Sequence, residues 1–164
     1  MGAAKSTEPL RAGKRAPVFR LTDLENGNVE MNTLWKDGPV LLAFFKSTCP
    51  VCQMTLPLLD RIHEGGSGAM RIYGVSQDDA ETTREFAAEF GLHLPVLLDT
   101  EESGYPASNA YGLSHVPTMF LVERDGAISW SGEGFHKREF EALANQAGVN
   151  PFRPGENIPE WKAG

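Results

Sequence analysis

An unbroken apolar run at residues 40–45, Val-Leu-Leu-Ala-Phe-Phe, constrains the fold of this chain most strongly. Gly38-Pro39 precedes it, and a run of this length behind such a breaker is typical of a strand buried on both faces. The next residues, 49–64, predict a helix that contains Pro57, and residues 70–75 predict a second buried strand. A strand, a helix and a strand in this order indicate an α/β protein built on a partly parallel sheet.

The rest of the chain continues the alternation of strands and helices. Residues 16–30 predict an extended hairpin with its turn at Asn26-Gly27-Asn28. Asp78 and Glu81 resemble a capping pair for a helix that Gly91 ends. The later elements are a short strand at 94–98, a short helix at 107–111, strands at 116–122 and 127–131, and a helix at 137–147. These elements predict one α/β sandwich with mixed strand directions.

Composition excludes several classes of function. The chain has 164 residues, of which 41% are hydrophobic and 23% charged, as in an ordinary soluble domain. Its net charge of −7 is scattered and offers no basic patch, so nucleic acid and anionic membranes are not expected partners. No stretch approaches the roughly 20 apolar residues of a membrane span. The polar start predicts a cytoplasmic protein as written, or a periplasmic or other extracytoplasmic one if an export signal has been removed.

The two cysteines, Cys49 and Cys52, are the main candidates for chemistry. They lie three residues apart, which is too close for a disulfide between them to stabilise the fold much. They are expected to begin the helix that follows the buried strand. A thiol at a helix N-terminus faces unpaired amide donors and the positive end of the helix dipole, and both favour the thiolate. Cys49 is therefore the expected attacking thiolate. Cys52, one turn further on, is placed to resolve a mixed disulfide.

Other uses of a cysteine pair remain open at this point. Structural zinc requires four ligands, and no second cysteine pair exists. Copper binding by the pair together with a histidine is conceivable, and so is an inert pair in the core. The four histidines are spread through the chain without ligand spacing, at His63, His93, His115 and His136. Redox exchange remains the favoured interpretation.

Several motifs resemble those of thioredoxin-fold proteins. Residues 44–52 are similar to the active-site stretch of that fold, and Pro57 stands where the fold has a helix-kinking proline. Val116-Pro117-Thr118 resembles the loop whose cis-proline faces the disulfide. Residues 16–23 resemble the opening of the redoxin branch, which holds the TlpA/ResA-type oxidoreductases and the alkyl hydroperoxide reductase/thiol-specific antioxidant peroxidases.

The resemblance implies a thioredoxin-like three-layer α/β/α sandwich with a mixed central sheet and an N-terminal β-hairpin extension. It also implies a thiol–disulfide oxidoreductase that exchanges the Cys49–Cys52 pair with protein or small thiol substrates. Such a protein needs no metal and no cofactor beyond its redox-active disulfide. The substrate is then expected to contact Pro50, Val51, Val116 and Pro117, and the protein is expected to be a monomer.

The residues that tune the cysteines depart from the family pattern. Ala43 stands where thioredoxin buries an aspartate, and Gln77 stands near the position where ResA-type proteins place a glutamate. Asp78, the next residue, is either the missing proton acceptor or only a helix cap. His115 is expected near the site, where its protonated form would favour the thiolate, although a simple loop histidine is an equal alternative.

A peroxiredoxin-like peroxidase is the main alternative within the superfamily. Peroxiredoxins hold peroxide with a Pro-x-x-x-Thr/Ser-x-x-Cys frame. Counted back from Cys49, that frame falls on Leu42 and Lys46, and counted back from Cys52 it falls on Phe45 and Cys49. Neither register fits, so the oxidoreductase interpretation is preferred over both the peroxidase and a copper-binding module.

The chain is expected to have three parts. Residues 1–13 predict a flexible N-terminus, residues 14–148 the thioredoxin-like domain, and residues 149–164 a Pro-rich tail. Because Phe152 and Trp161 are large and apolar, the tail is expected to pack across the domain, with a disordered tail as the alternative.

Overall fold

A computed structural model of the protein describes residues 9–164. The predicted flexible segment at 1–13 therefore lies mostly outside the described residues. In its described part, the Leu10 N–H donates to the Tyr111 carbonyl at 3.1 Å and the Gly13 N–H donates to the Ile128 carbonyl at 2.8 Å.

A seven-stranded mixed sheet forms the centre of the molecule, in the order β2-β1-β5-β4-β3-β6-β7. Strands β3, β4 and β5 run parallel, and the strands outside them pair antiparallel. The bounds are β1 Arg20–Asp23, β2 Asn28–Glu30, β3 Val40–Phe45, β4 Arg71–Ser76, β5 Val96–Leu98, β6 Thr118–Val122 and β7 Ile128–Glu133. The central position of β3 explains why all six of its residues are buried.

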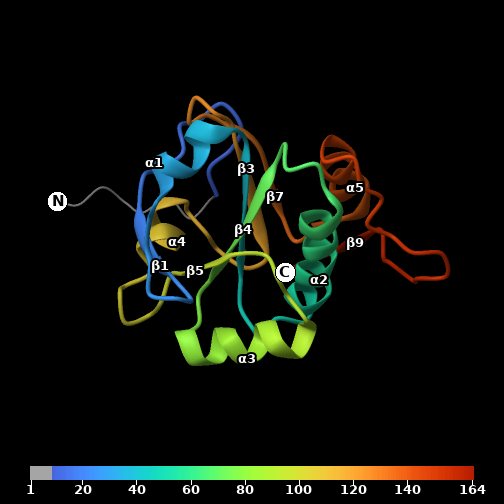
Figure 1. Ribbon diagram of the computed structural model, residues 1–164, viewed down its shortest axis with the longest axis horizontal. Coiled ribbons are helices and arrows are strands. Elements are labelled where there is room, and N and C mark those ends of the chain that lie inside the picture. The colour runs from blue at the N-terminus through green and yellow to red at the C-terminus, as the bar shows by residue number, and fades with distance from the viewer. Residues whose placement is uncertain (1–8) are drawn as a thin grey trace.

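Helices cover both faces of the sheet and bury two separate cores (Figure 1). One core packs α2, α3 and α5 against the sheet, and the other packs α1 and α4 against the opposite face. The bounds are α1 Met31–Leu34, the short 3₁₀ turn Trp35–Asp37, α2 Pro50–Gly65, α3 Ala80–Phe90, α4 Pro106–Ala110 and α5 Lys137–Gln146. The predicted α/β class with a mixed central sheet is thus confirmed. Within residues 9–164, no helix has the length and apolarity that a bilayer crossing requires.

The start of α3 corrects one prediction. Asp79, not Asp78, is the N-cap, and its carboxylate accepts a hydrogen bond from the Thr82 N–H at 2.8 Å. This hydrogen bond lowers the pKa of Asp79. The sequence has two adjacent aspartates, either of which could cap α3, and the backbone of the turn after β4 places Asp79 at the cap position. Asp78 is left with a different partner, described below.

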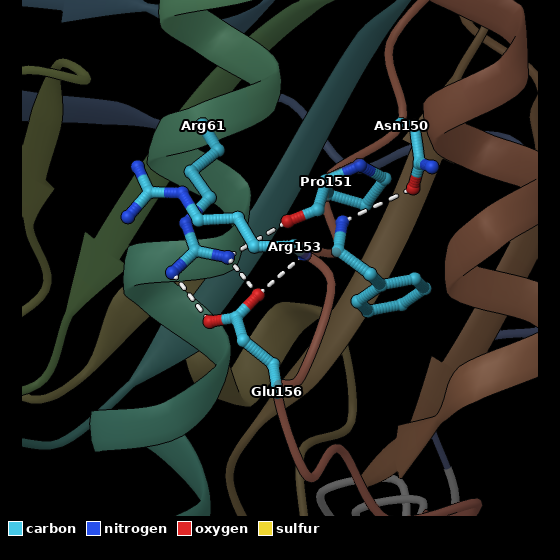
Figure 2. Close-up of polar contacts among 6 residues, drawn as sticks. Arg61, Asn150, Pro151, Arg153 and Glu156 are labelled. Atoms are coloured by element: carbon cyan, nitrogen blue, oxygen red, sulfur yellow. Dashed lines mark hydrogen bonds and ion pairs between the residues drawn. The ribbon is translucent and has the colours of Figure 1, made fainter.

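The tail packs against the domain, as its large apolar residues predicted. The Phe152 ring lies 6.0 Å from the Phe140 ring of α5. Arg61 of α2 holds the tail against the domain (Figure 2). Its guanidinium donates two hydrogen bonds to Glu156, at 2.7 and 2.8 Å, and one to the Pro151 carbonyl at 2.8 Å; these contacts are called the clasp. Beyond this clasp, β9 (Trp161–Lys162) pairs with β8 (Phe135–His136) as a small antiparallel ribbon that the sequence did not predict.

Candidate active site

The cysteine pair lies where β3 passes into α2. Cys49 is the N-cap of α2, with φ −86° and ψ 114°, and its sulfur accepts a hydrogen bond from the Cys52 N–H at 3.1 Å. Both thiols are free; Cys49 is partly exposed and Cys52 is fully buried. Pro50 fits the first helical position because that residue has no intrahelical partner for an N–H. The first turn of the helix therefore exposes one sulfur and buries the other.

Cys52 is held in its protonated form. Its side chain lies in the core cluster that also contains Ala43 and Leu56. Burial raises the pKa of the Cys52 thiol well above its usual range, and a side-chain hydrogen bond between the two thiols raises the pKa further. A backbone hydrogen bond with Lys46 acts in the opposite direction but is weaker than burial. The two thiols thus differ in burial and in their hydrogen bonds.

The loop before β6 forms the opposite wall of the site. The Val116–Pro117 peptide bond is cis, as the resemblance implied, and Pro117 is buried. The Val116 carbonyl oxygen lies 3.6 Å from Cys49 Sγ. Cys49, Pro50, Gln77, His115 and Val116 share a cavity of about 380 Å³ that opens to solvent. Val51 does not line it and packs instead against the core cluster around Cys52.

Asp78 faces the cysteine segment. Its carboxylate accepts a hydrogen bond from the Ser47 N–H at 2.7 Å, and its negative charge contributes to the raised pKa of Cys52. Asp78 also lines a second open cavity of about 380 Å³, together with Lys46 and Asp79. The carboxylate therefore contacts the segment that leads to Cys49 on one side and an open cavity on the other.

The other two tuning candidates have fixed partners. The Gln77 side-chain amide donates to Ser108 Oγ at 2.9 Å. The His115 ring is exposed. Its Nδ1 lies 2.9 Å from Ser114 Oγ and 4.0 Å from the Glu133 carboxylate. The structure thus brings His115 to the wall of the Cys49 cavity and orients it toward an acid.

Sequence reasoning missed a buried network that supports this wall. Asp99 is fully buried and accepts hydrogen bonds from the Ala107 N–H, the Ser108 N–H and the Ser108 hydroxyl, at 2.9, 2.7 and 2.5 Å. Ser108 in turn holds Gln77. The only signal in the sequence was an aspartate directly after a short apolar strand, which is too common to single out.

The copper alternative gains no third ligand from the described part of the chain. There, the group of ligand atoms close enough to hold a metal ion is Asp60, Glu64 and His93, which includes neither cysteine. Asp60 in this group already accepts hydrogen bonds from the His93 and Leu94 N–H groups at 2.7 and 2.8 Å.

The AhpC/TSA family profile matches residues 12–131, which is most of the chain. The chain belongs to the AhpC/TSA family. Among its relatives, thiol-disulfide oxidoreductase ResA of Bacillus thuringiensis is 29% identical over 123 residues, covering 74% of this chain and 69% of the relative. ResA of Geobacillus thermodenitrificans is 30% identical over 121 residues, covering 73% and 67%.

Solved structures share the fold of this chain. A Chlorobium tepidum protein assigned as the thiol:disulfide interchange protein DsbE is 26% identical, with a TM-score of 0.72 over 84% of this chain and 95% of that one. The thioredoxin domain of a Bacteroides vulgatus thiol-disulfide oxidoreductase has a TM-score of 0.73 at 22% identity, covering 84% and 99%. This AhpC/TSA member is therefore a TlpA/ResA-like redoxin and a thiol–disulfide oxidoreductase, as the motifs indicated.

Proposed function

We propose that Cys49 and Cys52 carry out the exchange reaction and that no metal or other cofactor takes part. The difference between the two thiols supports this division of roles most directly. Cys49 is partly exposed and its sulfur accepts a hydrogen bond from the Cys52 N–H, while Cys52 is buried and protonated. The nucleophile in thiol–disulfide exchange is a thiolate that a substrate can reach.

The reaction has two balanced steps. The Cys49 thiolate attacks one sulfur of a substrate disulfide, so a Cys49–substrate bond forms, the substrate S–S bond breaks, and the leaving sulfur takes a proton. Cys52 then loses its proton and attacks the Cys49 sulfur. The Cys49–Cys52 disulfide forms and the second substrate thiol is released. Two electrons pass from the cysteine pair to the substrate. Of the two protons that the substrate sulfurs take, one is matched by the proton that Cys52 loses and the other comes from solvent, because Cys49 starts as the thiolate. The reverse sequence oxidises a substrate dithiol.

Asp78 is the proposed proton acceptor for Cys52. Its carboxylate is fixed by the Ser47 N–H, acts on Cys52 electrostatically and reaches solvent through its own cavity. His115 is proposed to stabilise the Cys49 thiolate when protonated, because it lines the same cavity. Pro50, Gln77, Val116 and Pro117 would then contact or position the substrate.

The family implies protein thiol substrates. We further propose that the protein acts as a monomer, and that it works outside the cytoplasm, where its ResA and DsbE-like relatives are typically found. The Cys49 cavity is lined by residues of one chain and opens to solvent, which supports the proposal of a monomer.

Redox titration tests the proposed function. The protein is equilibrated in graded dithiol/disulfide buffers, and free thiols are trapped with a mass-shifting alkylator. We expect one reversible two-electron transition, which Cys49→Ser and Cys52→Ser each abolish. Peroxide consumption and copper binding by the reduced protein are measured beside it. A missing transition together with rapid peroxide turnover or a cysteine-dependent copper site would overturn the proposal.

A further inference from the structure

Residues 161–164, called here the end segment, lie against the wall of the Cys49 cavity. The segment begins as β9 on β8 and passes Gly134, where an added Cβ would lie 2.5 Å from the Lys162 carbonyl oxygen. It reaches Gly164, where an added Cβ would overlap the Val116 carbonyl oxygen and lie 2.8 Å from the His115 ring. Gly164 therefore packs directly on the carbonyl that lies 3.6 Å from Cys49 Sγ.

The end segment also divides one hollow surface in two. Gly164 lines the 380 Å³ cavity beside Cys49, whereas Trp161 and Ala163 line a neighbouring cavity of about 340 Å³. His115 lines both. If Ala163 and Gly164 moved away, the two cavities would join into a groove that runs from Cys49 along β7.

The contacts of the end segment are weak compared with those of the tail before it. Its residues are exposed, including Trp161 at 57%, whose ring lies 6.2 Å from His136. The β8–β9 ribbon has two residue pairs, too few for independent stability. The clasp between Arg61 and Glu156, in contrast, holds Pro151 and Glu156 on α2 through hydrogen bonds that do not involve the end segment.

We propose that the end segment determines substrate selectivity by occupying the place where the backbone of a peptide substrate lies. This inference rests on the proposed role of Cys49. A cysteine within a peptide brings flanking backbone to the Val116 edge when its sulfur reaches Cys49 Sγ, so it must displace Gly164. A small disulfide brings no backbone and reacts with the segment in place.

Two substrates with the same leaving group test this. One is an unstructured peptide whose single cysteine carries a thionitrobenzoate group, and the other is mercaptoethanol capped in the same way. Single-turnover release of the coloured thiolate is measured with the reduced protein. Gly164→Ala and removal of residues 161–164 are expected to raise the peptide rate by about five- to tenfold. Both changes remove the docked end segment, which otherwise competes with the peptide backbone for the same place. The rate with capped mercaptoethanol should stay within about twofold.

The control is Gly65→Ala. This glycine ends α2 far from the site, and an added Cβ there makes only ordinary contacts of 3.6 Å with Val149. It should change neither rate. A peptide rate that falls on removal of the segment would mean that the segment binds the substrate, and this would overturn the inference. Equal changes with both substrates, or none, would overturn it as well.

Amide hydrogen exchange gives a second readout. In Cys52→Ser protein trapped as a mixed disulfide, the peptide should increase exchange at residues 162–164, and mercaptoethanol should not. Unchanged exchange in the peptide adduct would contradict displacement. Failure of the proposed function itself looks different, because the redox titration would then show no two-electron transition of the cysteine pair, whatever the two release rates are.

Discussion

The Cys52 N–H donates to Cys49 Sγ at 3.1 Å, so the backbone of the buried cysteine supports the exposed one. The same helical turn that provides this donor carries the Cys52 side chain into the core. Cys49 therefore gains a hydrogen bond from a backbone amide, and Cys52 is shielded from solvent. The asymmetry needed for an attacking and a resolving thiol comes from a single turn of α2.

The first prediction concerns the reactivity of the two thiols. In reduced protein at pH 7, iodoacetamide should modify Cys49 at least about tenfold faster than Cys52, because burial limits access to Cys52 and raises its pKa. Peptide mass mapping over time measures both rates. In denaturant the rates should become similar. Faster modification of Cys52 in the folded protein would reverse the proposed roles.

The second prediction concerns the stability of the reduced protein at high pH. The pKa of Cys52 is raised by folding, so native protein keeps a proton that the unfolded chain loses above about pH 8.5. The free energy of unfolding should therefore decline as pH rises from about 8.5 toward 10.5. Urea unfolding of wild-type and Cys52→Ala protein, both reduced, isolates this contribution. Identical pH slopes would show that Cys52 does not titrate as described.

The third prediction tests Asp78 as the proton acceptor. Asp78→Asn keeps an oxygen for the Ser47 N–H but cannot take a proton, so resolution of a mixed disulfide by Cys52 should slow on the order of a hundredfold. Stopped-flow measurement of the second step, at several pH values, gives the rate. Asp79→Asn is the matched control, since it removes the same charge one residue away and asparagine still caps α3. Equal rates in the two variants would exclude a special role for Asp78.

The fourth prediction concerns the clasp between α2 and the tail. The hydrogen bonds from Arg61 hold the pKa of the Glu156 carboxyl at about 2, below its ordinary 4.5. Its stabilising effect is present above pH 4.5 and is lost as pH falls toward 2. Glu156→Gln should thus be less stable than wild type at pH 5 to 7, with the difference vanishing near pH 2 in thermal unfolding. Glu160→Gln, in a pair of 3.9 Å with an 85% exposed carboxylate, should show no such window.

The fifth prediction concerns the buried support of the cavity. Asp99→Asn replaces one acceptor oxygen by an amide that cannot accept the Ser108 or Ala107 N–H. Loss of one such buried bond should lower the free energy of unfolding by about 1–3 kcal/mol. It should also loosen Gln77, which Ser108 holds. Urea unfolding measures the first effect, and an unchanged stability would contradict the network.

The sequence by itself determined the framework of this protein. The apolar run at 40–45 identified the central strand, and the Cys-Pro-Val-Cys spacing placed a thiol at a helix N-terminus. Both follow from local rules of burial and hydrogen bonding that neighbouring residues satisfy on their own. The choice of Asp79 over Asp78 as the cap of α3 did not follow, because it depends on the geometry of one turn.

The resemblance had already indicated that Val116 and Pro117 face the cysteines, but only the tertiary structure decided the other contacts around them. It placed Asp78 against Ser47, which is 31 residues away in the chain, and it buried Asp99 beneath α4. It also placed Gly164 on the Val116 carbonyl. These contacts join segments that are distant in sequence, and no local pattern encodes such a meeting. They arise because the packing of helices on a shared sheet brings the ends of several elements to one edge.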